Sequence, residues 1–542
     1  MTPSLIVCVA GLAWFARPAQ VAPPPAHAAF FDVRDFGATG RRGDDARPAL
    51  QKAIDACAAA GGGTVLVPPG EYVTGSLELR SHVRVVVDSG ATLLSAKGRA
   101  AFPKDALFYG EDLENVTLEG RGSVDGRAEY EWRENDLDDR YIHPNLVRQQ
   151  AAGKSLRRSF PKADSVGHLV QLVRCKDVAI RGLSFVRSPS WTMNLWGCER
   201  VVLDGLDIRT DLKDGVWADG IDPDGCRDLH ISDCTVVTGD DALVFYSTDT
   251  FGPARPCEDV TVTNCRLTSS SSAIKFCDGN QNCVRRVAID NCVITDSNRG
   301  IAFMVFDGGT VSDVVISNVV IDCTRRDWFW WGEGDPLHFN VKRRNEIDPK
   351  LAAGSQPPAG SIRNVLIRNV VARGFGTSSI FGHLDRPLEN VTIDGLALHL
   401  SRDPAAAYET ADHAIALKWA KNFQLKNAEI FWDEPASANW KSALDVESVS
   451  GLVLEGVRAR QGGAGGAAGG APAILLRNVA GATLRGCTAL AGTDAFLHLA
   501  GGANREIQLI GNDLILAQRA FDADQPVDLT ALHSSNDLIR DR

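Results

Sequence analysis

The sequence predicts an all-β chain that folds as a single parallel β-helix, a solenoid with a capping helix at its N-terminal end. Two observations predict this fold. A short apolar phrase recurs along the chain at a nearly regular interval, and no helical periodicity separates its copies. Because a solenoid grows by stacking coils, 542 residues, 44% of them hydrophobic, are compatible with one domain.

The recurring phrase is a β-branched or aliphatic run that follows Asp, Asn or Arg. Its copies are Asp177–Ile180, Arg200–Leu203, Asp228–Ile231, Asp259–Val262, Arg286–Ile289, Asp313–Ile316, Asn364–Ile367 and Asn390–Ile393. The spacing of these copies along the sequence is typical of repeat architectures. The longest step, from Asp313 to Asn364, is about twice the others, and we interpret it as two coils, one of which carries an insertion.

The N-terminal segment, about residues 29–70, departs from the repeat and is expected to cover the open end of the solenoid. Asp44 or Asp45 is expected to cap a helix over about residues 46–60. The apolar positions that share one face of this helix are Leu50, Ile54 and Cys57.

Two insertions are expected to interrupt the coils, at about residues 127–167 and 324–359. Long insertions on a rigid scaffold commonly carry function. We therefore expect one or both to contribute to a binding site.

The segment 1–28 is expected to be a signal peptide. An apolar run, Leu5–Ala16, precedes the small-x-small triplet Ala26-His27-Ala28, and the run is too short to span a bilayer. Residues 29–542 are then the mature β-helix domain, and we expect it to be secreted or periplasmic.

Charge limits the partners. The net charge is -11 and no long basic run is present, so a nucleic-acid partner is not expected. We expect a monomer with no membrane span.

Cysteines recur at coil boundaries, as small polarizable side chains do in the internal ladders of a solenoid. Without the leader twelve remain, and no pair has zinc-binding spacing. We expect buried free thiols, with Cys277 and Cys283 as the one candidate disulfide.

A second set of strands locates a candidate site. Leu243, Ile274 and Ile301 align in one column, and Phe245, Phe276 and Phe303 in another. Because strand side chains alternate between faces, these columns face the core and the column between them, Val244, Lys275 and Ala302, faces outward. One coil earlier, the same grid stacks Asp219 on Asp241 and places Asp222 in the outward column of Lys275.

Three carboxylates are the candidate catalytic residues: Asp219, Asp240 and Asp241. Neighbouring coils lie about 4.8 Å apart, and a bend at Gly239 would let Asp240 and Asp241 reach the same cleft. Crowded carboxylates keep a proton on one member of the group. The protonated member can act as the acid of glycoside hydrolysis, and an ionised neighbour can act as the base. Alternatives are aspartates that cap turns and a calcium site.

Several segments carry a resemblance to polygalacturonases of glycoside hydrolase family 28, over about residues 30–400. They are Phe31–Gly37, Gly61–Gly70, Trp217–Asp222 and Thr238–Asp241. The resemblance implies a right-handed parallel β-helix that inverts the anomeric centre without a metal or cofactor. It also implies that Asp240 is the general acid and that Asp219 and Asp241 hold the attacking water.

The basic residues with which such polygalacturonases hold a galacturonate carboxylate are replaced here. Ser272 stands where the family has the His of Gly-His-Gly, and Ala302-Phe303-Met304 stands for Arg-Ile-Lys. Lys275 and Arg299 are candidate substitutes; alternatively, Lys275 is a solvated surface residue and Arg299 a structural partner of an aspartate. The replacements predict a changed sugar preference.

Further substrate contacts are expected from Asp222 and from tryptophans, whose flat apolar faces suit sugar rings. The segment Trp328–Pro336 resembles one found in bacterial members of the family, and Trp331 is its main candidate. Trp217 is a second candidate, and Trp191 and Trp196 are weaker ones. Alternatively, the tryptophans of Trp328–Pro336 fill the space under a long loop.

The predicted function is therefore inverting hydrolysis of α-glycosidic bonds in pectin-type polysaccharide or its oligosaccharides. Rhamnogalacturonan or substituted galacturonan is favoured over plain polygalacturonan. The alternatives are a polysaccharide lyase of the same fold and a non-catalytic glycan-binding β-helix.

Overall fold

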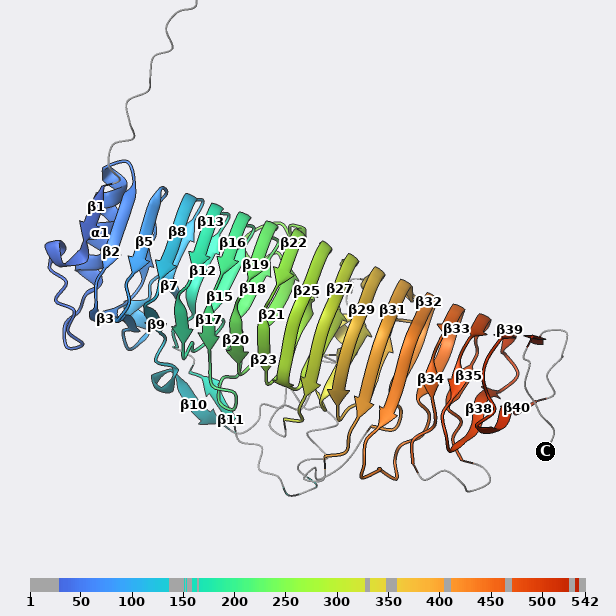
Figure 1. The fold of residues 1–542 in the computed structure, drawn as a ribbon. Coiled ribbons are helices and arrows are strands. Elements are labelled where there is room, and N and C mark those ends of the chain that lie inside the picture. Colours follow the sequence, from blue (N-terminus) through green and yellow to red (C-terminus); the bar gives the residue numbers. More distant parts are fainter. Residues whose placement is uncertain are drawn as a thin grey trace, which may run out of the picture.

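The computed structural model is a right-handed parallel β-helix (Figure 1), which confirms the predicted fold. It describes residues 29–135, 151, 153, 158–162, 165–326, 332–347, 358–403, 411–463, 470–525 and 532–535. The predicted signal peptide and Trp331 lie outside the described residues. Within them, no helix combines the length and apolarity needed to cross a membrane.

Each coil contributes strands to three parallel stacks. The first stack contains the recurring phrase: β1 (Phe30–Asp32), β2 (Gly63–Val67), β5 (Val83–Val87), β8 (Glu114–Gly120), β13 (Lys176–Arg181), β16 (Glu199–Asp204), β19 (Arg227–Ser232), β22 (Cys257–Thr263), β25 (Cys283–Ser297), β27 (Thr310–Cys323), β29 (Ser361–Gly374), β31 (Leu388–Leu400), β32 (Ile415–Trp432), β33 (Leu444–Glu455), β36 (Ala480–Arg485), β39 (Arg505–Ile510) and β41 (Leu532–Ser535).

The second stack follows the first after a tight turn: β3 (Gly70–Thr74), β6 (Ala91–Ser95), β9 (Ser123–Asp125), β14 (Ser184–Val186), β17 (Asp207–Arg209), β20 (Thr235–Thr238), β23 (Arg266–Ser269), β34 (Arg458–Ala459) and β37 (Thr488–Ala489). From β25 to β32 one long strand spans both stacks. The first residues of β32 and β33 also belong to the third stack, where they lie between β30 and β35.

The third stack carries the candidate site: β4 (Leu77–Glu78), β7 (Ala106–Glu111), β12 (His168–Val173), β15 (Met193–Trp196), β18 (Ile221–Asp224), β21 (Leu243–Ser247), β24 (Ser272–Asn280), β26 (Arg299–Val305), β28 (Asp335–Val341), β30 (Ser378–Phe381), β35 (Ile474–Arg477), β38 (Thr493–Ala500) and β40 (Ala517–Ala523).

The helix α1 (Arg47–Ala59) lies at the N-terminal end, beside β1 and β2 (Figure 1), and packs Leu50, Ile54 and Cys57 into the core. This confirms the capping helix and its buried face. Its N-cap is Ala46, without a side-chain hydrogen bond, so the prediction that Asp44 or Asp45 caps it is wrong. Asp45 instead accepts from the backbone N–H of Arg47 at 3.0 Å.

The repeat register confirms the phrase as the unit of stacking. Val178, Val201, Leu229 and Val260 pair in sequence from coil to coil. Interpreting the longest step of the repeat as two coils is wrong, because Val314 pairs directly with Val365 and the step is therefore one coil.

The predicted insertion at 324–359 contains that coil's third-stack strand. β28 pairs with β26 before it and with β30 after it, and the short helix α3 (Arg344–Ile347) follows it. The rest of the 324–359 segment therefore precedes and follows a regular strand. In the 127–167 segment, β10 (Trp132–Asn135) and β11 (Arg158–Pro161) form an antiparallel pair outside the main sheet.

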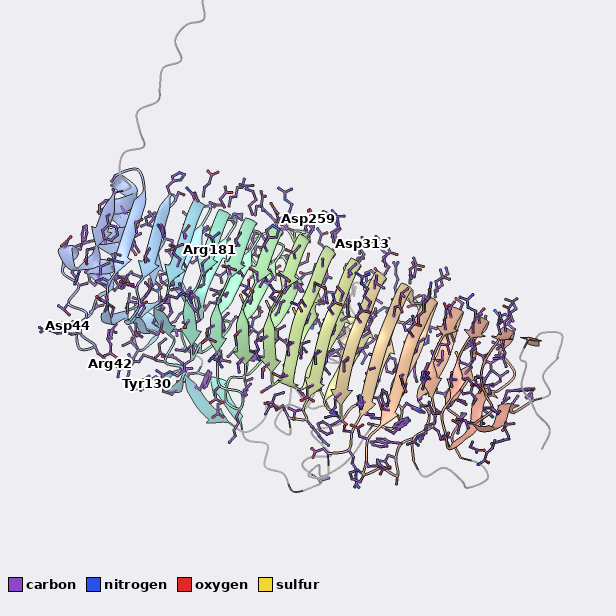
Figure 2. The ribbon with its side chains drawn as sticks, viewed as in Figure 1. Arg42, Asp44, Tyr130, Arg181, Asp259 and Asp313 are labelled. Carbon is purple, nitrogen blue, oxygen red and sulfur yellow. The ribbon has the colours of Figure 1, made fainter. Side chains whose placement is uncertain are left out.

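Turn aspartates form their own edge of the solenoid. Asp177, Asp228, Asp259 and Asp313 begin their phrases in the left-handed conformation, with φ of 54° to 59°. Figure 2 shows Asp259 and Asp313 along the same edge. Asp219, Asp240 and Asp241 are not among the described residues with positive φ, so they do not belong to this edge.

The predicted core columns are confirmed. Leu243 pairs with Ile274 and Ile274 with Ile301, and all three are buried. The phenylalanine column continues beyond the prediction through Phe339, with ring centroids 4.3 Å apart at each of the last two steps. This continuous ladder fixes the register of the strands that carry the site.

Eleven cysteines have described side chains, and all eleven are free thiols. Ten of these are buried, and Cys283 is partly exposed. Because Cys283 is free, the predicted disulfide with Cys277 is wrong; the side chain of Cys277 is outside the described ones.

Candidate functional site

The carboxylate cluster is assembled by the register of β18 and β21. The Gly220 N–H donates to the Asp241 carbonyl at 2.9 Å, and Ile221 N–H to the Ala242 carbonyl at 3.0 Å. These bonds place Asp219 one coil before Asp241, as predicted. Asp222 accordingly lies at the outward position of β18, opposite Val244 of the next coil.

The bend that brings Asp240 and Asp241 together has a different cause from the one expected. The chain bends at Gly239 and Asp240, but Gly239 has no positive φ. A Cβ at this position would lie 2.2 Å from the Asp211 carbonyl oxygen and 2.5 Å from that of Gly215. Glycine is therefore required because another backbone segment passes here, not because the turn is left-handed.

Asp241 is held by two donors. Its Oδ1 accepts from the Ser272 backbone N–H and its Oδ2 from the Lys275 ammonium, each at 2.8 Å. Lys275 also forms an ion pair with Asp278 at 3.4 Å, and its side chain is only 13% exposed. The simple alternative of a solvated surface lysine is therefore wrong.

Asp240 is the most exposed of the four carboxylates, at 7%, compared with 2% for Asp219 and Asp241 and 0% for Asp222. Its Oδ2 accepts from the backbone N–H of Trp217 at 3.1 Å. Trp217 has a φ of 66° and its side chain is exposed. One strained residue thus both orients Asp240 and presents an indole to solvent.

Burial and mutual repulsion favour the protonated form of the carboxyls on the Asp219 side of the cluster. Burial raises the pKa of Asp219 well above its ordinary value, and the charges of Asp240, Asp222 and Asp241 add to this effect. Burial also raises the pKa of Asp222, an effect that its contact with Asp219 partly offsets. No other described group donates to either Asp222 oxygen or to Asp219 Oδ1. A carboxyl proton shared between Asp219 and Asp222 satisfies both.

Arg299 occupies the predicted column, paired with Ser272 before it and Asp335 after it. Its guanidinium is 6% exposed, with Nε 3.6 Å from Asp335 Oδ2 and Nη1 donating to Met304 Sδ at 3.6 Å. Burial lowers the pKa of Arg299, and the charges of Asp335 and Asp241 oppose that change. Both candidate cations are therefore already balanced by carboxylates of the protein.

Sequence reasoning missed His338, Gln171 and Asn194. Each is the outward residue between two core residues of a third-stack strand, the same pattern that located Lys275. His338 follows Ala302 in the outward column, and burial lowers the pKa of His338 to about 4. Extending the alternation grid by one coil on the C-terminal side and two on the N-terminal side would have found them.

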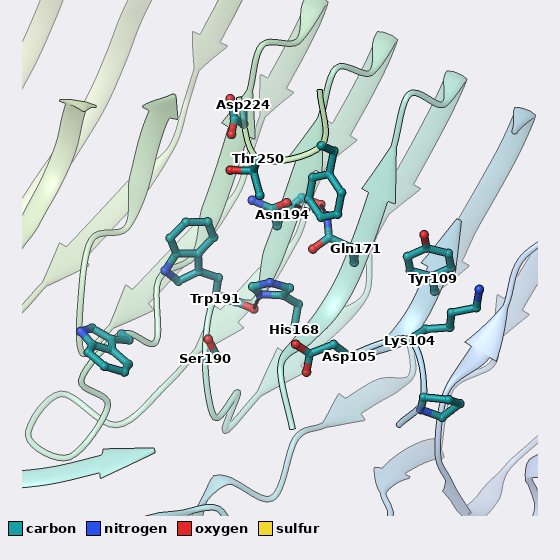
Figure 3. Close-up of a pocket in the computed structure, with 13 residues that line it drawn as sticks. Lys104, Asp105, Tyr109, His168, Gln171, Ser190, Trp191, Asn194, Asp224 and Thr250 are labelled. Carbon is teal, nitrogen blue, oxygen red and sulfur yellow. Dashed lines mark hydrogen bonds between the residues drawn. The ribbon is translucent and has the colours of Figure 1, made fainter. Parts of the chain in front are cut away.

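A pocket of about 760 Å³ opens on the N-terminal side of the cluster (Figure 3). Its floor is the outward column Tyr109, Gln171 and Asn194, the rungs that precede Asp222. Its other lining residues are Pro103, Lys104, Asp105, His168, Ser190, Trp191, Trp217, Asp224, Thr250 and Phe251. The pocket and the carboxylates therefore share one face of the solenoid.

Of the predicted tryptophans, the pocket contains Trp217 and Trp191. The Trp191 ring stacks on Tyr246, with centroids 5.2 Å apart and an interplanar angle of 23°. Trp196 is buried, at 1% exposure, and cannot present a face to a ligand.

Metal binding has no preformed centre in the part of the chain that the structure describes, where no group of three His, Cys, Asp or Glu could hold an ion. The Asp241 oxygens that a cation would need are engaged by Lys275 and Ser272.

Comparison with known proteins places these features in context. Residues 57–325 match the model of the glycosyl hydrolases family 28. A probable polygalacturonase of Vitis vinifera is 26% identical over 265 residues, which cover 44% of this chain and 49% of that protein. The chain thus spans about half the length of this relative.

Two solved structures share the fold. An exopolygalacturonase from Thermotoga maritima has a TM-score of 0.57 and 20% identity, covering 74% of this chain and 92% of that one. A family 28 exopolygalacturonase of Yersinia enterocolitica has a TM-score of 0.58 and 17% identity, covering 80% and 78%. At these identities the likeness is one of fold.

Proposed function

Because this chain belongs to the glycosyl hydrolases family 28, we propose that it hydrolyses α-glycosidic bonds in a pectin-type polysaccharide or its oligosaccharides. The observation that carries the proposal is the cluster of Asp219, Asp222, Asp240 and Asp241, in which buried carboxyls with raised pKa values lie beside a carboxylate paired with Lys275. Binding alone does not require four carboxylates to be crowded together.

The proposed mechanism is inversion by acid and base. Asp240, the most exposed carboxyl, protonates the leaving oxygen, while Asp219 and Asp241 hold the attacking water. Strongly interacting carboxylates titrate as a group. In the reactive form of the cluster, Asp240 carries the proton that goes to the leaving oxygen, and the ionised Asp219 and Asp241 take up the proton that the attacking water loses.

Rhamnogalacturonan or substituted galacturonan is the proposed substrate, rather than plain polygalacturonan. The nearby cations Lys275 and Arg299 are paired with Asp241, Asp278 and Asp335, which leaves little uncompensated positive charge for a run of uronates. A lyase is disfavoured, because its base must be neutral and the Lys275 ammonium lies between two carboxylates.

The test is a panel of pectic and hemicellulosic oligosaccharides assayed for new reducing ends. We expect release from at least one substituted or rhamnose-containing oligosaccharide and a loss of about 10²- to 10⁴-fold in kcat for Asp240→Asn. Equal rates for the wild type and Asp240→Asn would remove Asp240 from the mechanism. No product from any member of the panel would refute the proposed activity.

A further inference from the structure

We propose that the pocket on the N-terminal side of the cluster binds one uncharged sugar residue of the substrate, adjacent to the bond that is cleaved. The inference rests on the proposed function and names the sugar class on that side of the bond. It combines the position of the floor, the amide pair within it, the aromatic wall and the balance of charge.

The floor leads directly into the cluster. Gln171 pairs with Asn194 and Asn194 with Asp222, all at the outward position of successive coils. Since neighbouring coils lie about 4.8 Å apart, a sugar ring on Gln171 and Asn194 has its next linkage at the carboxylates. Figure 3 shows Gln171, Asn194 and Trp191 around the same space.

The amide pair offers one donor and one acceptor. Gln171 Nε2 donates to Asn194 Oδ1 at 2.6 Å, which leaves the Gln171 carbonyl and the Asn194 amide N–H groups for a ligand. If the oxygen and nitrogen of both amides are exchanged, the pair still offers one donor group and one acceptor to a ligand. Both residues are buried, and each is only 4% exposed. A donor beside an acceptor matches two neighbouring sugar hydroxyls.

The aromatic wall suits the apolar face of a pyranose. The Trp191 ring stacks on the Tyr246 ring, and its centroid lies 5.6 Å from that of the His168 ring. The Nδ1 atom of His168 is 3.2 Å from the Trp191 carbonyl oxygen. Burial lowers the pKa of His168 to about 4, so this ring is neutral at the pH of most assays. The wall therefore contributes area and shape without charge.

The charged groups around the pocket offer an anion little attraction. Lys104 is the one cationic residue in the described lining; it is exposed and lies over the Tyr109 ring at 5.0 Å. Asp105 and Asp224 are also in the lining; Asp105 is paired with Arg99, and burial raises the pKa of Asp224 to about 6. A uronate carboxylate here would therefore meet one exposed lysine and no buried cation among the described lining residues, whereas a neutral sugar meets hydroxyl-binding groups.

The experiment measures binding apart from turnover. We would titrate the Asp240→Asn protein with L-rhamnose, D-galactose, D-xylose and D-galacturonate, followed by ligand-observed NMR. At least one neutral sugar should bind, about tenfold or more tightly than galacturonate. Trp191→Ala and Asn194→Leu, each added to Asp240→Asn, should weaken that sugar about three- to tenfold. Galacturonate binding equal to or tighter than every neutral sugar overturns the proposal.

A substitution that should reverse the preference for a neutral sugar over galacturonate provides a gain-of-binding control. Gln171→Lys adds a cation to the floor and should raise galacturonate affinity while lowering that of the neutral sugar. Gln508→Lys makes the same change at an exposed position of β39 and should alter neither. If the wild type cleaves the panel but pocket variants bind sugars unchanged, the subsite is wrong and the proposed function stands. If the wild type releases no product, the proposed function fails and with it the subsite's role in substrate positioning.

Discussion

Replacing Asp224 by Asn tests whether burial in the pocket wall controls the charge of this face. Asp224 is 3% exposed, and burial raises its pKa from 3.8 to about 6. Its Oδ1 accepts from the Thr248 backbone N–H at 2.7 Å, and its Oδ2 from the Thr248 hydroxyl. An asparagine keeps the first of these bonds and removes the titration.

The sign of the effect follows from the direction of the shift. The folded protein binds the Asp224 proton more tightly than the unfolded chain, so this group's contribution is most favourable below pH 3.8 and is lost as the pH rises through about 6. At 1.36 kcal/mol per pKa unit, the shift corresponds to about 3 kcal/mol. As the pH rises from 3.8 through about 6, the unfolding free energy of the wild type should fall by up to that amount relative to that of Asp224→Asn.

The assay is urea unfolding of both proteins at a series of pH values, followed by circular dichroism. The difference between the two unfolding free energies is the measured quantity, because the titration of all other groups largely cancels in it. Asp35→Asn, at an exposed position near the N-terminal end, is the matched control. A difference between wild type and Asp224→Asn that stays constant with pH would refute the reasoning.

Three further substitutions test the site and its support. Lys275→Met leaves Asp241 buried without its cation. We therefore expect a lower kcat, measured by kinetics, and a destabilisation of about 3–5 kcal/mol, measured by urea unfolding. An unchanged kcat would contradict the pairing role of Lys275. Phe276→Ala removes a ring from the buried ladder and should cost about 3–5 kcal/mol; a change below about 1 kcal/mol would mean that the ladder repacks. Gly239→Ala places a Cβ against the Asp211 carbonyl and should reduce kcat by displacing Asp240, with normal activity as the contrary outcome.

The sequence was sufficient for the fold and for the location of the site because both depend on strict alternation. Leu243, Ile274 and Ile301 define a core column from apolar residues alone, and once that column is fixed, Lys275 and Asp222 must face outward. The same register brings Asp219 and Asp241 together. These are consequences of strand geometry and coil spacing.

The remaining features depend on contacts that alternation does not encode. The interpretation of the step from Asp313 to Asn364 as two coils is wrong because this coil contains many more residues than its neighbours. The Leu337-His338-Phe339 pattern of β28 is therefore hard to align with the other strands from sequence alone. The need for glycine at 239 arises from the Asp211–Gly215 segment passing beside it, a tertiary contact. The pairing of Lys275 with Asp278, and of Arg299 with Asp335, likewise follows from side-chain packing.

Proton NMR of the reaction from its first minutes tests the central claim most directly, because it reports both the bond that breaks and the geometry of attack. With the substrate identified by the panel, we predict a new reducing-end anomeric signal of inverted configuration, strongly reduced with Asp240→Asn. A product of retained configuration would contradict the proposed roles of Asp219, Asp240 and Asp241, and an unsaturated sugar signal would contradict hydrolysis itself.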